Sequence, residues 1–260
     1  MTAADLVEWY VRAALAEIPR RPLVIGICGA QGSGKSTVAA AVVERLAASG
    51  IAAATVSLDD LYRTRADRLA LAATVHPLLA TRGVPGTHDT ALGLTLFAAL
   101  DRREAVRLPR FDKRSDDRAP ESKWQPVVAG LDVLIFEGWC VDAVAQSDAD
   151  LADPVNALER NEDSDGRWRA YVNAALGGPG YRALFARIDR LILLAAPGFE
   201  VVAGWRTEQE RRGARAITAA EVGRFIAHYE RLTRHILAEM PARADLVIRL
   251  APERSVDHSL

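Results

Sequence analysis

The stretch that decides the fold reads Gly29-Ala30-Gln31-Gly32-Ser33-Gly34-Lys35-Ser36, and it fits the pattern G-x-x-x-x-G-K-[ST] at every position. An apolar run ends just before it, and an alanine-rich run follows it. Glycines let the backbone turn its N–H groups toward an anion, and the start of the following helix adds its positive end. The pattern therefore predicts that these eight residues, with Thr37, bind nucleotide phosphates. Lys35 would reach the β- and γ-phosphates, and Ser36 would offer its hydroxyl to Mg²⁺.

Five short apolar runs along the chain are typical of buried parallel strands, and longer helix-like stretches separate them. The runs cover residues 23–28, 52–57, 132–136, 190–195 and 246–250. Strands that alternate with helices predict an α/β class, with a doubly wound, mostly parallel five-stranded sheet and helices on both faces. Together with the phosphate loop, this alternation predicts a P-loop NTPase fold that carries a lid.

The composition is that of an ordinary globular chain. The 260 residues include 33 basic and 34 acidic side chains, and half of the residues are apolar. A length of this size suits one domain over residues 1–260, with an N-terminal helix at 1–20, insertions on the acceptor side at 81–124 and a lid at 204–216. The near-neutral charge argues against a nucleic-acid partner. No apolar run suits a membrane span or a secretory signal, so we expect a cytoplasmic protein without a membrane partner.

Two residue types stand out because they are rare. Cys28 and Cys140 each adjoin an apolar run, so we expect buried thiols in a reducing compartment. Only three of the 33 basic residues are lysines, namely Lys35, Lys113 and Lys123. A compact ammonium and a planar guanidinium differ in chemistry, so these positions deserve separate consideration.

Carboxylates follow two of the predicted strands, at the edge where ligands bind in open α/β sheets. Asp59 and Asp60 come directly after the second run, and adjacent residues there point in different directions. We assign Asp59 as the base for an acceptor hydroxyl, and Asp60 as a metal-binding or orienting group. Glu137 ends the third run in a Walker-B-like position, where it would hold Mg²⁺ together with Ser36.

An arginine-rich segment precedes the Thr218 capping box, within residues 205–215. Phosphoryl transfer spreads negative charge over the transferred group, and arginines on a closing lid stabilise that charge. We therefore expect Arg206, with Arg211 or Arg212, to close over the transition state. The alternative is a solvated helical face with Glu–Arg pairs.

Two further stretches fit neither strand nor helix: a turn-rich one at 82–88 and a long charged one at 108–124. Loops of this length inside a compact domain tend to be functional. If the acceptor is anionic, these loops are the natural source of its partners. The candidate acceptor-binding residues are Asp60, Tyr62, His88, Asp89, Arg110, Asp112, Lys113 and Arg118.

Several segments in this order resemble the D-glycerate 3-kinase group, within the phosphoribulokinase/uridine kinase set of P-loop kinases. Besides the phosphate loop, they are S-L-D-D-L-Y at 57–62, G-V-P-G-T-H-D at 83–89, L-P-R-F-D-K at 108–113, I-F-E-G-W at 135–139 and W-R-T-E-Q-E at 205–210. The resemblance implies a kinase that uses ATP and Mg²⁺ to make 3-phosphoglycerate from D-glycerate, with Asp59 as its base. One segment departs from the group: residues 114–118 read R-S-D-D-R, where a glycine-rich G-R-G-D-R is frequent.

Two alternatives remain open. The first is a nucleoside or pantothenate-type kinase of the same set, although an aromatic content of 6% offers few stacking partners for a base. The second is a P-loop ATPase or nucleotide-dependent switch that has no acceptor. A GTPase is disfavoured because no N-K-x-D segment occurs and no lysine follows position 123.

Overall fold

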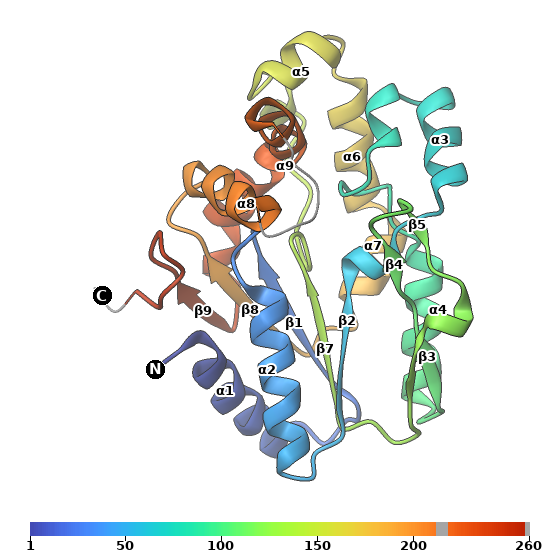
Figure 1. Ribbon diagram of the computed structural model, residues 1–260, viewed down its shortest axis with the longest axis vertical. Helices are drawn as coiled ribbons and strands as arrows, with labels where there is room; N and C mark the ends of the chain where they lie inside the picture. Colours follow the sequence, from blue (N-terminus) through green and yellow to red (C-terminus); the bar gives the residue numbers. More distant parts are fainter. Residues whose placement is uncertain (212–217, 258–260) are drawn as a thin grey trace.

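The computed structural model describes residues 1–211 and 218–257 and contains the predicted parallel sheet (Figure 1). Its strand order is β2-β7-β1-β8-β9, and every neighbouring pair is parallel. The α/β prediction is therefore confirmed, with strand ends within two residues of those expected. The strands are β1 (Leu23–Gly29), β2 (Ala53–Ser57), β7 (Val133–Gly138), β8 (Arg190–Ala195) and β9 (Leu246–Arg249).

Both faces of the sheet are buried, as the continuous apolar runs predict. Along β1, Leu23, Ile25 and Ile27 join the core on one face, whereas Val24 and Cys28 join the core on the other. The first face is covered by α1 (Ala3–Glu17), α2 (Lys35–Ala48) and α8 (Glu200–Arg211), and the second by α4 (Thr90–Asp101) and α7 (Pro179–Phe185). The long helix α9 (Ala219–Glu239) packs against both cores.

The register of the strands brings the carboxyl ends of β1, β2 and β7 level with one another. Glu137 on β7 lies opposite Ile27 on β1 and opposite Ser57 on β2. The phosphate loop continues directly from β1, and Asp59 follows two residues after Ser57. Because all three strands run in the same direction, these segments meet at one carboxyl edge of the sheet.

The helix predictions from capping residues are confirmed. Thr218 and Glu221 form the predicted capping box at the start of α9. Asp89 caps α4 by accepting a hydrogen bond from the Leu92 amide. The stretch from 154 to 186 is mostly helical and contains α5 (Ala157–Glu162), α6 (Arg167–Gly177) and α7. Helices α5 and α6, together with α3 (Arg65–Thr74), lie beyond the carboxyl ends of the strands (Figure 1).

The charged segment at 108–124 is more regular than predicted. It contains a short hairpin of β4 (Phe111–Asp112) and β5 (Asp117–Arg118), and its ends pair as β3 (Val106–Leu108) and β6 (Gln125–Val127). A helix that the apolar runs above do not include, α3 (Arg65–Thr74), precedes it, with Thr64 as its N-cap and Arg68 as its only fully buried residue. Leu71 of this helix packs against a small core that contains Leu78 and Leu79, so its apolar residues and its Thr64 cap are signals from which the helix could have been predicted.

The two thiols are buried and free, as expected, and burial raises the pKa of Cys28 to about 12. Among the helices of residues 1–211 and 218–257, none is both long enough and apolar enough to cross a membrane.

Candidate active site

The phosphate loop connects β1 to α2 through two glycines with left-handed backbones. Gly32 has φ +78° and Gly34 has φ +91°, and Gly34 is the N-cap of α2. At position 32 a Cβ would lie 2.7 Å from the Cβ of Trp205, which packs directly on the loop from α8. Glycine is therefore needed at position 32 both for its conformation and for its small size.

The hydroxyl of Ser36 and the carboxylate of Glu137 are hydrogen-bonded, with Oγ 2.9 Å from Oε1. Glu137 is 3% exposed, and its second oxygen, Oε2, has no hydrogen-bond partner among the described residues. A buried, unpartnered carboxylate oxygen beside a hydroxyl fits a hard divalent cation that takes oxygen ligands. These two residues, which the sequence pairs as metal ligands, are thus brought together.

The carboxylate of Asp59 lies at the end of β2 and has two polar partners. Tyr62 donates to its Oδ1 at 2.6 Å, and the ammonium of Lys113 donates to its Oδ2 at 2.8 Å. Burial acts to raise the pKa of Asp59, but the ammonium groups of Lys113 and Lys35 outweigh burial and hold the pKa well below its ordinary value. Asp59 is therefore ionised and able to accept a proton.

The neighbouring Asp60 points to the charged insertion instead. Its Oδ1 accepts from the Phe111 amide at 3.0 Å, and its Oδ2 accepts from Arg110 at 3.0 Å. Burial raises the pKa of Asp60, and the contacts with Phe111 and Arg110 oppose that rise. Asp60 thus fastens the β4–β5 hairpin to the end of β2, which explains how Lys113 reaches Asp59.

His88 forms a buried stack behind the Asp59 carboxylate. Its ring lies 4.8 Å from that of Tyr62, and its Nδ1 lies 2.6 Å from the hydroxyl of Tyr181. Burial lowers the pKa of His88 to about 3, so the ring is neutral at physiological pH. A neutral ring in this position supports Tyr62 without adding a charge near Asp59.

Two more predicted residues form an ion pair on the same side. Arg118 donates to Oδ2 of Asp89 at 2.9 Å and to the Tyr62 carbonyl at 3.1 Å. The Asp89 carboxylate also caps α4, so both of its oxygens are used by the protein. This pair therefore ties the β4–β5 hairpin to the start of α4 and to the segment that carries Tyr62.

Asp112 is not brought to the site. Its carboxylate accepts from the Arg114 amide at 2.9 Å and from the Ser115 hydroxyl at 2.9 Å, so it stabilises its own turn. These local hydrogen bonds lower the pKa of Asp112.

The insertion is anchored by two arginines that the sequence does not single out. Arg68 is 1% exposed, and its guanidinium lies 3.0 Å from the carboxylate of Asp116. Arg82 is also paired with Asp116, and both guanidinium groups lie over the ring of Phe111. A single buried arginine forms no recognisable motif, so no sequence signal marks this anchor.

The predicted lid arginines lie only partly within the described chain. Arg206 is on α8, and its guanidinium carbon lies 4.7 Å from the centre of the Phe225 ring on α9. The side chain of Arg211 and the whole of Arg212 lie outside the described residues, as does most of the segment from 209 to 217.

A cavity of about 290 Å³ opens on the phosphate loop. Besides residues of the loop and of the start of α2, its walls include Trp205, Glu208 and Arg254. The sequence does not mark Arg254, which follows the last strand. The one sequence feature that could have indicated Arg254 is its place after the last strand, because residues after β9 reach the same carboxyl edge as those after β1.

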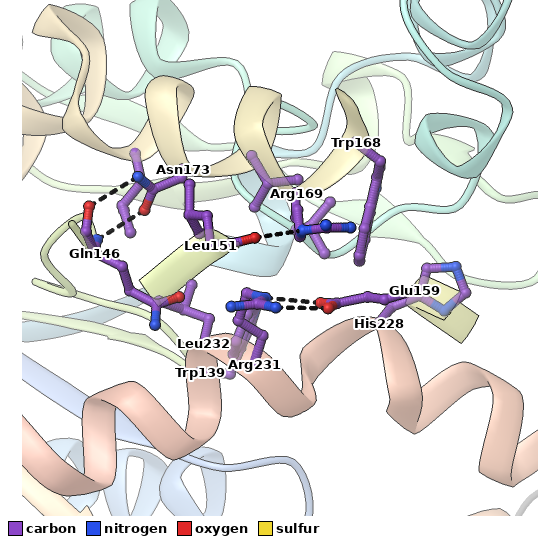
Figure 2. A pocket seen from close by; sticks show the side chains of 13 residues that line it. Trp139, Gln146, Leu151, Glu159, Trp168, Arg169, Asn173, His228, Arg231 and Leu232 are labelled. Atoms are coloured by element: carbon purple, nitrogen blue, oxygen red, sulfur yellow. Dashed lines mark hydrogen bonds and ion pairs between the residues drawn. The ribbon is translucent and has the colours of Figure 1, made fainter. Parts of the chain in front are cut away.

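A second cavity lies between α5, α6 and α9 and has room for about one water molecule, at about 20 Å³ (Figure 2). Figure 2 shows the ion pair of Arg231 with Glu159 and the hydrogen bond from Arg169 to the Leu151 carbonyl. None of the residues predicted for the site lines this cavity. Its paired charges join three helices, so its polar groups have a structural role.

Comparisons with known proteins agree with this fold. Residues 24–153 match the model of the phosphoribulokinase/uridine kinase family. An uncharacterized kinase of Schizosaccharomyces pombe, mug58, is 34% identical over 246 residues, which are 88% of this chain and 87% of that protein. The chloroplastic D-glycerate 3-kinase of Arabidopsis thaliana is 29% identical over 80% of this chain, but the match spans only 46% of the plant protein. The structure of a D-glycerate 3-kinase from Cryptococcus neoformans superposes with a TM-score of 0.81 at 24% identity, covering 97% of each chain.

Proposed function

Because the chain belongs to the phosphoribulokinase/uridine kinase family of kinases, we propose that it transfers the γ-phosphoryl group of ATP to the 3-hydroxyl of D-glycerate. The observation that carries this proposal is the ionised carboxylate of Asp59 beside an ammonium, at the sheet edge that also carries the phosphate loop. A carboxylate suits the hydroxyl of a small acid, and an ammonium suits its carboxylate. The names of two relatives, both D-glycerate 3-kinases, support the choice of acceptor.

The chain's own residues supply the binding and the proton transfer. The amides of residues 29–37 and the ammonium of Lys35 hold the phosphates, and the positive end of α2 points at the same anion. The acceptor oxygen attacks the γ-phosphorus while the bond to the bridging β,γ-oxygen breaks. Asp59 takes the hydroxyl proton, and ADP leaves with the bridging oxygen.

Ser36 and Glu137 are the residues that would hold Mg²⁺. The unpartnered Oε2 of Glu137 supports this assignment, because a buried carboxylate oxygen is costly unless a cation or donor meets it. When bound, the cation neutralises charge on the β- and γ-phosphate oxygens. Arg206, with Arg211 or Arg212, would add positive charge over the transferred group from α8 and the segment that follows it.

Lys113 is proposed as the partner of the acceptor's anionic group. Its side chain is 57% exposed, so it can turn from Asp59 to a bound carboxylate without crossing the core. The other two cations predicted to bind the acceptor are paired with carboxylates: Arg110 with Asp60, and Arg118 with Asp89. A small anion that replaces Asp59 as the partner of Lys113 would also leave the Asp59 carboxylate free to accept the proton of the acceptor hydroxyl.

The experiment that tests this function measures ADP release in a coupled assay with D-glycerate, uridine, pantothenate or water alone as acceptor. The proposal predicts release that depends on D-glycerate and is near background with the other three. Release that depends on uridine or pantothenate instead would show that the protein is a kinase with a different acceptor. Equal release in water alone would identify an ATPase without an acceptor.

A further inference from the structure

The turn that follows β9 is built to present one arginine at the carboxyl edge. Leu250 and Val256 form a bridge, the Ala251 amide donates to the Ser255 carbonyl at 2.9 Å, and the Arg254 amide donates to the Ala251 carbonyl at 2.8 Å. Arg254 itself has φ +71°, a left-handed backbone that a residue with a Cβ adopts at some cost. A strained arginine held by a hydrogen-bonded turn suggests that its position has a use.

The guanidinium of Arg254 makes three contacts at the phosphate loop. Its Nε donates to the carbonyl of Gly32 at 2.7 Å, and its Nη2 lies 2.7 Å from a carboxylate oxygen of Glu208. Its carbon lies 5.4 Å from the centre of the Trp205 ring, over the face of the indole. The indole in turn donates to the Pro252 carbonyl at 2.6 Å, so ring and turn hold each other in place.

Glu208 places a negative charge in the wall of the cavity, and Arg254 compensates that charge. Glu208 and Arg254 both line the cavity that opens on Lys35 and Ser36. A carboxylate in the wall of a polyphosphate site repels the ligand, and this repulsion is stronger in a partly buried site than in water. The guanidinium of Arg254 neutralises that carboxylate and also fixes the carbonyl of Gly32, which leaves the loop free to present its amides inward.

We propose that Arg254 is a nucleotide-positioning residue, which compensates Glu208 and closes the outer wall of the cavity above the phosphate loop. The proposal rests on the proposed function in one respect only, namely that this loop binds a nucleotide. It assigns a role to the turn after β9 and to its contacts with α8, which the phosphate-loop pattern does not cover. It also predicts that Arg254 and Glu208 act on nucleotide affinity as a coupled pair.

The test measures the binding of ADP in the presence of Mg²⁺ by titration calorimetry, without any acceptor. Arg254→Ala should weaken ADP by about tenfold, the effect of losing one charge-assisted contact. Glu208→Gln alone should bind as tightly as the wild type or more tightly, and it should restore most of the affinity when added to Arg254→Ala. Arg254→Lys, which keeps the charge but loses the planar fork, should fall between the wild type and Arg254→Ala. Arg102→Ala removes an exposed arginine that is paired with Glu104, and it should match the wild type.

The outcomes separate this inference from the function on which it rests. A double variant as weak as Arg254→Ala would mean that Arg254 acts only through the loop's structure, which overturns the proposal. Affinity unchanged in Arg254→Ala would also overturn it. Failure of the wild type itself to bind ADP would overturn the proposed function and this inference together.

Discussion

The ammonium of Lys113 lies 2.8 Å from a carboxylate oxygen of Asp59, although the two residues are 54 positions apart in the chain. The β4–β5 hairpin carries Lys113, and Asp60 holds that hairpin through the Phe111 amide and the guanidinium of Arg110. Two adjacent aspartates therefore have separate tasks: Asp60 positions the insertion, and Asp59 faces the cation that it delivers. The proposed reaction depends on this division.

Asp59→Asn should lower kcat by about a hundredfold to ten-thousandfold, because an amide cannot accept the hydroxyl proton. The amide oxygen can still accept from Lys113 and the amide NH2 can donate to the Tyr62 hydroxyl, so folding and ATP binding should persist. Steady-state kinetics and ADP titration measure the two effects separately. A variant that turns over at near the wild-type rate would exclude Asp59 as the base.

Lys113→Met should raise the KM for the acceptor by about tenfold and leave the KM for ATP nearly unchanged. Lys123→Met is the matched control, because it removes the other exposed lysine of the same insertion. Equal effects of the two variants on the acceptor KM would show that Lys113 has no special part in acceptor binding.

The pH dependence of Lys113→Met provides an independent check. In the wild type the pKa of Asp59 lies below its ordinary value of 3.8, so this carboxylate is ionised throughout the range above about pH 4. Its ion pair stabilises the folded chain in that range, and this contribution is lost as the pH falls through the lowered pKa. Removal of the ammonium takes away the larger of two charges that lower the pKa, so the acid limb of kcat/KM should move to higher pH. An acid limb that does not move would contradict the coupling of Lys113 to Asp59.

Glu137→Gln should increase the Mg²⁺ concentration for half-maximal activity by at least about tenfold, because an amide is a far weaker ligand than a carboxylate. The side chain keeps its shape and can still accept from Ser36, so the fold should be retained. Magnesium titrations of the variant, with Glu104→Gln as a surface control, measure the effect. An unchanged magnesium dependence would exclude Glu137 as a ligand of Mg²⁺.

Gly83→Ala should destabilise the fold by about 3 kcal/mol, as measured by urea denaturation. Its φ is +131°, and an added Cβ would lie 2.0 Å from the hydroxyl of Tyr229. Gly223→Ala, in an exposed turn of α9 with open space around it, should instead stabilise the fold by up to about 1 kcal/mol. If both variants have the same stability, the close packing of the 82–88 segment under Tyr229 is not as described.

The sequence predicts the sheet and its edge well because both depend on local patterns. The five strands are apolar runs, and the phosphate loop is a contiguous motif. Asp59 follows one of these runs and Glu137 ends another, so both are predicted at the carboxyl edge that the loop also reaches. The charged insertion is harder to predict. The pairing of Asp116 with Arg68 and Arg82 joins residues far apart in the chain, and no local pattern encodes such a contact.

Single residues were harder to assign than elements. Asp112 belongs to a motif that resembles an acceptor-binding segment, yet its carboxylate stabilises its own turn. Arg254 belongs to no motif and still reaches the phosphate loop, because a turn after the last strand returns the chain to the same edge. Such assignments depend on where a side chain points, and residue spacing does not encode that.

The most direct test of the proposed reaction is a competition experiment followed by phosphorus NMR. The protein is incubated with ATP, Mg²⁺ and equal concentrations of D-glycerate, uridine and pantothenate, and the phosphorylated products are identified. The account predicts 3-phosphoglycerate and ADP in equal amounts, with no phosphate ester on the other two acceptors. An ester on uridine or pantothenate, or inorganic phosphate as the only product beside ADP, would contradict it.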